Sequence, residues 1–108
     1  MTNPSKRKGD AFERLVAGYL AEAVPCERIP AGNEIDRSDL WTPTAAVQCK
    51  NVARLSLGAW WDATVEQQAA AGKGWGWLVV KRRGVADPAR QFAVCDVAQL
   101  RAALEVLP

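Results

Sequence analysis

Histidine is absent from this 108-residue chain, cysteine occurs only three times, and no apolar run approaches the roughly 20 residues that span a bilayer. The absence of histidine excludes a histidine general base, a histidine-dependent triad and histidine ligation of a metal ion. Cys26, Cys49 and Cys95 form no Cys-x-x-Cys pair, which argues against a zinc site made of cysteine alone. We interpret all three as reduced, buried residues of a cytoplasmic protein. Any catalysis therefore has to use carboxylates, lysine and a bound metal ion.

The charge of the chain is nearly balanced, with 14 basic and 12 acidic residues and a net charge of +2. Six of the basic residues nevertheless fall in two triplets, Lys6-Arg7-Lys8 and Lys81-Arg82-Arg83. Such triplets are typical of surfaces that bind phosphate backbones, and the alternative is ordinary solubilising charge. No hydrophobic segment follows the basic N-terminus, so we expect neither a secretory signal nor a membrane partner.

The length and the ordinary composition, 49% hydrophobic and 24% charged, predict one domain over residues 1–108, with residues 1–8 as a basic arm. Apolar periodicity predicts helices over residues 9–24, 57–71 and 97–107. Apolar and β-branched segments between turns predict strands over residues 27–30, 35–41, 45–52, 75–80 and 90–95. This order indicates an α/β fold of three layers, with a central mixed sheet flanked by helices.

The predicted helices each have an apolar face that is expected to point inward. On the first helix the face consists of Phe12, Leu15, Val16, Tyr19 and Leu20. On the second helix it consists of Leu57, Trp60, Trp61, Val65 and Gln68. Gln68 could touch a site or serve as a hydrogen-bonded core amide. Trp60 and Trp61 are interpreted as core or dimer-interface residues, with stacking on a base as the alternative, and Trp41, Trp75 and Trp77 as packing residues.

The most informative segment is the predicted strand that contains Gln48-Cys49-Lys50. Side chains alternate along a strand, so Gln48 and Lys50 share one face while Val47 and Cys49 share the other. A turn centred between Pro43 and Thr44 would oppose residues whose numbers sum to 87, and Asp39 would then face Gln48. Because proline fits poorly in a tight primed turn, a longer loop and another register remain open.

This pattern is what a magnesium-dependent nuclease needs. Asp39, the Gln48 amide oxygen and the Cys49 carbonyl are oxygen donors of the kind that Mg²⁺ or Mn²⁺ prefers, and Glu13 on the first helix offers a second carboxylate. The metal would activate a water, and Lys50 would orient that water or stabilise the transition state. The alternative roles are a turn aspartate, a solvated helix glutamate, a core amide and an edge-strand lysine.

Four segments, taken in order, resemble the phage and archaeal Holliday junction resolvases of the PD-(D/E)xK nuclease superfamily, most of all those of phages that infect actinobacteria. The segments are Lys8-Gly9-Asp10-Ala11-Phe12-Glu13, Asp36-Arg37-Ser38-Asp39-Leu40, Val47-Gln48-Cys49-Lys50-Asn51 and Lys81-Arg82-Arg83-Gly84. The resemblance implies a restriction-endonuclease-like fold, a helix glutamate at Glu13, a metal-binding aspartate at Asp39 and a catalytic lysine at Lys50. Gln48 stands where the family usually has glutamate, which implies weaker metal affinity or an inactive site.

The resemblance also implies the partners. We expect a homodimer that makes paired symmetric nicks in a four-way DNA junction, in a bacterial host cytoplasm if a phage encodes the chain. Candidate phosphate-binding residues are Lys6, Arg7, Lys8, Arg37, Lys81, Arg82 and Arg83. Asp36 is a secondary candidate that more simply orders the loop with Arg37. Two other functions stay open: a related metal nuclease for flap, single-stranded or duplex DNA, and a DNA-binding protein of the same fold with lost chemistry.

Overall fold

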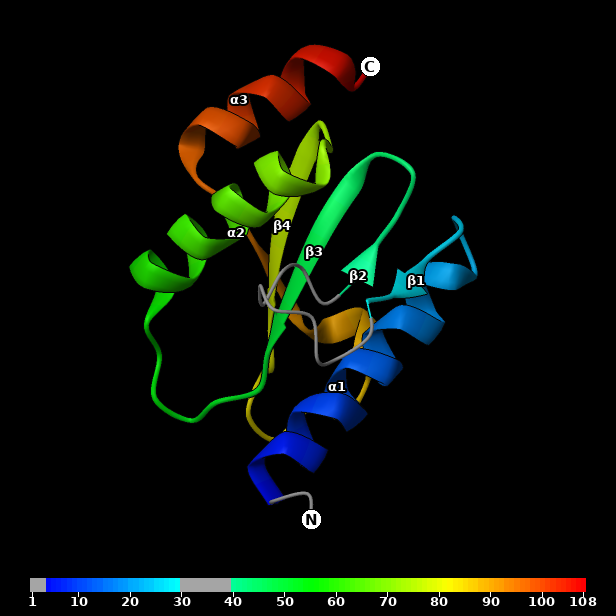
Figure 1. Cartoon of the computed structure of the whole chain (residues 1–108), viewed down its shortest axis with the longest axis vertical. Helices are drawn as coiled ribbons and strands as arrows, with labels where there is room; N and C mark the ends of the chain where they lie inside the picture. Colours follow the sequence, from blue (N-terminus) through cyan, green and yellow to red (C-terminus); the bar gives the residue numbers. More distant parts are fainter. Residues whose placement is uncertain (1–3, 30–39) are drawn as a thin grey trace.

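Five strands form one mixed sheet in the order β1-β2-β3-β4-β5, and three helices accompany it. The computed structural model describes residues 4–29 and 40–108. The strands are β1 (Glu27–Arg28), β2 (Leu40–Trp41), β3 (Ala45–Lys50), β4 (Trp75–Val80) and β5 (Phe92–Val94). The helices are α1 (Pro4–Ala21), α2 (Leu57–Ala71) and α3 (Val97–Val106), with a short 3-10 turn η1 (Pro88–Arg90) before β5. The predicted α/β class with a mixed central sheet is confirmed (Figure 1).

The hairpin between β2 and β3 has the register that the sequence predicted. Leu40 pairs with Val47 and Trp41 with Ala46, so both pairs sum to 87. The Thr42 hydroxyl accepts from the Ala45 amide at 2.9 Å, and this side-chain bond supports the turn that contains Pro43. The next pair in this register would be Asp39 with Gln48, but Asp39 lies outside the described residues.

α2 is the crossover that makes β3 and β4 parallel neighbours, and these two strands form the centre of the sheet. α2 ends at Gly72, whose φ of 68° is in the left-handed region that glycine adopts without strain. β4 then runs with Gly76, Leu78 and Val80 buried in alternation, as expected of a central strand. The ranges predicted for α2 and β4 are confirmed to the residue.

The main core lies between α1 and one face of the sheet. Phe12, Val16 and Ala17 pack against Leu40, Ala45 and Val47. Leu15 and Tyr19 were predicted to face inward and are exposed. None of the three cysteines forms a disulfide in the part of the chain that the structure describes, and all three are half-buried where the sequence predicted burial.

The helix ends differ from the prediction. α1 begins at Pro4, so residues 4–8 belong to the helix and not to a separate arm. Proline is well tolerated at a first helical position, and lysine and arginine are good helix formers. α1 ends at Ala21, ahead of Pro25, and the two edge strands, β1 and β5, are shorter than predicted.

The second layer, formed by α2, covers the opposite face and is unexpectedly polar. The buried residues of α2 are Thr64 and Gln67, and Thr64 contacts the buried Gln48 of β3. Leu57 and Val65 were predicted to face the sheet and are exposed. The helix is rotated away from its most apolar side because Gln48 points into this layer and needs a polar partner.

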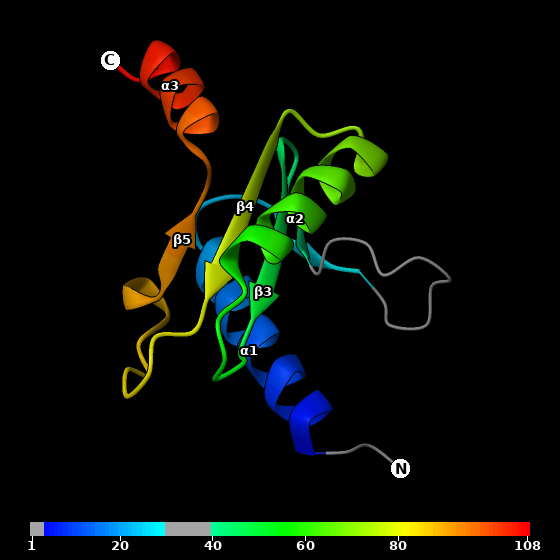
Figure 2. The same cartoon turned by 90° about the vertical axis from the view of Figure 1, so that its left-hand side faces the viewer.

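α3 stands apart from the other two layers. It has no buried residue, and Figure 2 shows it at the end of the molecule opposite the N-terminus. Its anchor is Gln99, whose amide accepts from the Gly76 amide at 3.1 Å and donates to the Gly76 carbonyl at 2.6 Å. Over the described ranges 4–29 and 40–108, no helix is long and apolar enough to cross a membrane.

Candidate active site

β3 presents Gln48 and Lys50 on the face covered by α2. Val47 and Cys49 pack toward the α1 core on the other face, so the predicted alternation is confirmed. Gln48 is buried with 4% of its surface exposed, whereas Lys50 is half-buried at the end of the strand. The strand therefore carries one enclosed amide and, two residues later, one cation with access to solvent.

Two residues of α2, Trp60 and Thr64, surround this pair. The Thr64 hydroxyl lies 2.8 Å from the Gln48 amide and 2.8 Å from the Trp60 carbonyl oxygen one turn earlier in the helix. The Lys50 ammonium group lies 5.9 Å from the centre of the Trp60 ring, a cation–π distance. Trp60 thus contacts Lys50 through its ring and the Thr64 hydroxyl through its backbone carbonyl.

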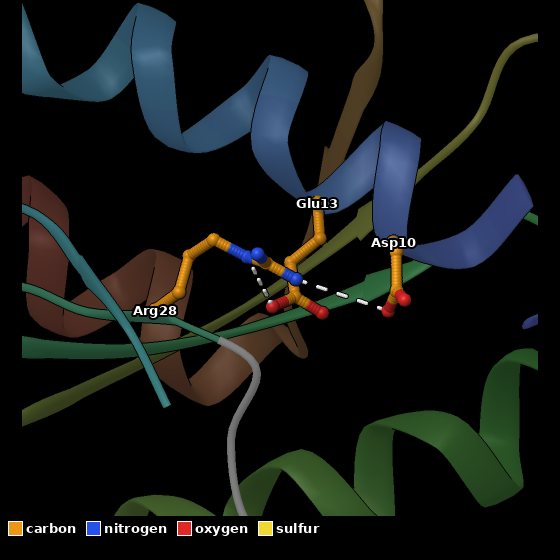
Figure 3. A network of polar contacts seen from close by, with 3 residues as sticks. All are labelled: Asp10, Glu13 and Arg28. Atoms are coloured by element: carbon orange, nitrogen blue, oxygen red, sulfur yellow. Dashed lines mark hydrogen bonds and ion pairs between the residues drawn. The ribbon is translucent and has the colours of Figure 1, made fainter. Parts of the chain in front are cut away.

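Glu13 lies on the α1 side of the sheet and is held by Arg28. Arg28 Nε donates to Glu13 Oε1 at 2.9 Å, and a second nitrogen of Arg28 lies 3.8 Å from an Asp10 carboxylate oxygen (Figure 3). Arg28 pairs with Leu40, which pairs with Val47, so this cluster sits beside β3 on the face opposite Gln48 and Lys50. Glu13 and Lys50 are therefore on different faces of the sheet.

The environment of Glu13 changes its acidity. Burial raises the pKa of the Glu13 carboxyl above its ordinary value, and the Arg28 hydrogen bond and charge lower it by less. Only 13% of the Glu13 side chain is exposed, compared with 35% for Arg28. Carboxylates with raised pKa values occur at functional sites and also in structural ion pairs.

Basic residues gather at the end of the molecule where β3 and β4 finish. Both views place the start of α1 at this end, together with the loops that follow β3 and β4 (Figures 1 and 2). Arg7 and Lys8 are exposed in the first turns of α1. The Arg83 guanidinium donates to the Asn51 side chain at 2.8 Å, which joins the two loops.

The second basic triplet is used partly within its own loop. The Lys81 ammonium group donates to the carbonyl oxygens of Arg82 and Val85, so it stabilises the turn. Arg82 lies over the Phe92 ring at 5.3 Å. Arg83 is the exposed member of the triplet, and its guanidinium is the one most open to a phosphate.

Several predicted site residues lie outside the described part of the chain. These are Asp36, Arg37 and Asp39, and the side chain of Lys6 is likewise not described. Gln68 is half-buried and donates to the Gly74 carbonyl at 3.0 Å, which fits the prediction of a hydrogen-bonded amide.

The described residues fit a hard cation only in part. Within residues 4–29 and 40–108, no three histidine, cysteine, aspartate or glutamate side chains come together. The Gln48 amide oxygen is a suitable neutral ligand, while the Glu13 carboxylate is engaged by Arg28. The charged ligand would therefore have to be Asp39, with the Cys49 carbonyl as a further predicted donor.

Arg28, Asp10 and Thr64 were missed by the sequence reasoning. The signal for Thr64 is its position four residues after Trp60 and one turn before Gln67 and Gln68, a polar stripe along α2. Arg28 has no comparable signal, because its contact with Glu13 depends on how β1 docks against α1.

Comparison of the chain with protein-family models, curated proteins and solved structures gave no match.

Proposed function

We propose that this protein is a magnesium- or manganese-dependent endonuclease that cuts branched DNA, with a restriction-endonuclease-like fold. The observation that carries the proposal is the placement of Gln48 and Lys50 on one face of the central strand β3, in the hairpin register predicted for a nuclease site. The order of elements supports it, since a helix, a hairpin and an α2 crossover precede the parallel strand β4.

In this proposal each residue has a separate task. The metal, when bound, lowers the pKa of a bound water and neutralises charge on the scissile phosphate. Asp39 and Gln48 would hold it, and the Lys50 ammonium group would donate to the attacking water or to a phosphate oxygen. Trp60 restrains Lys50 from one side, which reduces the entropy lost when the ammonium group is positioned.

The basic end of the molecule supports a DNA substrate. Arg7 and Lys8 belong to the first turns of α1, and Arg83 belongs to the loop after β4. These two segments and the end of β3, which is Lys50, lie at one end of the molecule (Figure 1). Cations spaced around a strand end suit the phosphates on either side of a cut. A four-way junction is the proposed substrate because the sequence motifs resemble those of junction resolvases.

A homodimer is part of the proposal. Two symmetric nicks on a junction need two active sites, and a twofold pair supplies them. Support comes from α3, whose apolar residues are uncovered: Val97, Leu100, Leu104 and Val106 are all exposed. Apolar surface of this kind on a small protein commonly marks a protein contact.

An Asp39→Asn variant tests the proposed chemistry. The substitution removes the charge that binds the metal and no phosphate contact, so cleavage of a junction should be lost while junction binding is kept. Cleavage is followed by denaturing electrophoresis and binding by a mobility shift. Full cleavage by the variant would remove Asp39 from the mechanism.

A second candidate, a DNA-binding protein of the same fold that has lost its catalytic activity, is favoured by two features of the site. Gln48 carries no charge, and the Glu13 carboxylate is paired with Arg28. A Gln48→Glu variant separates the two candidates. An active nuclease should keep or raise its cleavage rate when the charged ligand is restored, whereas a protein with no metal site should bind no Mn²⁺ in calorimetry before or after the change.

A further inference from the structure

The Thr64 hydroxyl lies within hydrogen-bond distance of two acceptor atoms, but it can donate to only one of them. It lies 2.8 Å from the atom placed as the Gln48 amide oxygen and 2.8 Å from the Trp60 carbonyl oxygen. A hydroxyl carries a single hydrogen, and both of these neighbours are acceptors. One of the two contacts would then bring two oxygens together without a hydrogen between them, which is unfavourable in a buried layer.

Reversing the Gln48 amide resolves the conflict. The oxygen and nitrogen of an amide exchange places on rotation by half a turn, and the surrounding hydrogen bonds decide between the two arrangements. With the nitrogen toward Thr64, Gln48 Nε2 donates to the Thr64 hydroxyl, and that hydroxyl donates to the Trp60 carbonyl. Every contact in the chain Gln48–Thr64–Trp60 then has a donor and an acceptor.

We propose that Thr64 is the positioning residue that fixes the Gln48 amide with its nitrogen toward α2 and its oxygen away from it. That oxygen would be the atom that ligates the metal. That last step depends on the proposed function, since it assumes that a metal binds near Asp39. The arrangement also gives a reason for glutamine at this position: a glutamate has no hydrogen to donate to Thr64 when ionised, so the hydroxyl would turn to the carboxylate and leave Trp60.

Four forms of the protein test the orientation by NMR, independently of nuclease activity. In the native protein, the Gln48 side-chain amide protons should show strong Overhauser contacts to Thr64 Hβ, and Thr64→Ser should preserve the corresponding contact. Thr64→Val keeps the shape but removes the hydroxyl, so the bonded amide proton should shift upfield. The Gln48→Glu variant identifies the signals, because it lacks them.

The same variants then address the metal by Mn²⁺ calorimetry. Thr64→Val should bind Mn²⁺ between about twofold and tenfold more weakly than the native protein, the effect of one lost hydrogen bond, and Thr64→Ser should bind normally. Missing Overhauser contacts in the native protein would overturn the orientation even if Thr64→Val did not fold. Equal Mn²⁺ affinity in Thr64→Val and the native protein would overturn the positioning role. Correct contacts with no Mn²⁺ binding in the native protein would support the orientation and refute the proposed function.

Discussion

Arg28 Nε lies 2.9 Å from Glu13 Oε1, and this bond joins the edge strand β1 to α1. The glutamate is the more enclosed partner, with 13% of its side chain exposed against 35% for the arginine. Burial of a carboxylate is unfavourable unless a cation or hydrogen-bond donors accompany it. Arg28 is therefore the group that allows Glu13 to remain ionised against the sheet.

Replacement of Arg28 by alanine should destabilise the protein and raise the pKa of Glu13 further, because the buried carboxylate loses its donor and its nearest cation. We expect a loss of about 0.5–1.5 kcal/mol in the free energy of unfolding, the range for one hydrogen bond, because the pair is partly exposed to solvent. Urea denaturation measures the stability, and a carboxyl NMR titration measures the pKa. Arg54→Ala, at an exposed site after β3, is the control and should change the stability by less than about 0.5 kcal/mol. Equal effects of the two substitutions would contradict the assigned role of Arg28.

The pKa of Glu13 also predicts a pH dependence of stability. Its folded-state value lies above its unfolded-state value, because burial outweighs Arg28. The folded state therefore holds the proton more tightly, and the associated stabilisation is complete below the unfolded pKa and disappears as pH rises through the folded pKa. Relative to Glu13→Gln, the native protein should lose stability as pH rises from the ordinary glutamate value of about 4 through the raised folded-state pKa. Unfolding curves of both proteins across this range provide the measurement, and a difference that does not vary with pH would refute the expectation.

A side chain at Gly76, near the start of β4, is expected to crowd the side of α2 that faces the sheet. A Cβ at this position would lie 2.9 Å from Gln68 Oε1 and 3.3 Å from both Gln68 Cβ and Thr64 Cγ2. Gly76→Ala should destabilise the protein by about 1–3 kcal/mol through overpacking between α2 and the sheet. Gly74→Ala, two residues earlier, has open space around its Cβ and is the matched control. Denaturant midpoints of the two variants give the comparison, and similar midpoints would mean that α2 packs less closely than described.

If α3 forms the proposed dimer interface, a charge at Leu104 should weaken the dimer. The Leu104 residue is 63% exposed on α3. Leu104→Lys places a charge in the apolar contact and should convert dimers to monomers in sedimentation velocity without loss of helical content. Val24→Lys makes the same kind of change near the end of α1, where 42% of the valine is exposed, and should leave the assembly intact. Dimers that persist in Leu104→Lys would place the interface elsewhere.

The elements with strong local signals were predictable from the sequence. The apolar run at Trp75–Val80 and the glycines around residues 72–74 fixed the ends of α2 and β4, and the turn at Pro43 and Thr44 fixed the hairpin register. These features depend on neighbouring residues, for which propensity and turn chemistry are sufficient. The alternation of Gln48 and Lys50 against Val47 and Cys49 follows from the strand geometry alone.

The contacts between elements were not predictable in the same way. Hydrophobicity favoured Leu57 and Val65 as the inner face of α2, yet the buried residues of this helix are Thr64 and Gln67, and Thr64 contacts Gln48. The partnership of Glu13 with Arg28 arises from the docking of β1 against α1, which no periodicity encodes. The roles of Asp36, Arg37 and Asp39 stay predictions from the sequence.

The most direct test of the nuclease proposal is incubation of the protein with a synthetic immobile four-way junction in Mg²⁺ or Mn²⁺, beside linear duplex and flap controls and a Lys50→Ala variant. We predict paired symmetric nicks in the junction alone, and their loss in Lys50→Ala with the fold intact. Cleavage of every substrate would indicate a less selective nuclease. Binding of the junction without any cleavage in either metal would contradict the proposed activity and favour a protein whose Gln48 marks lost chemistry.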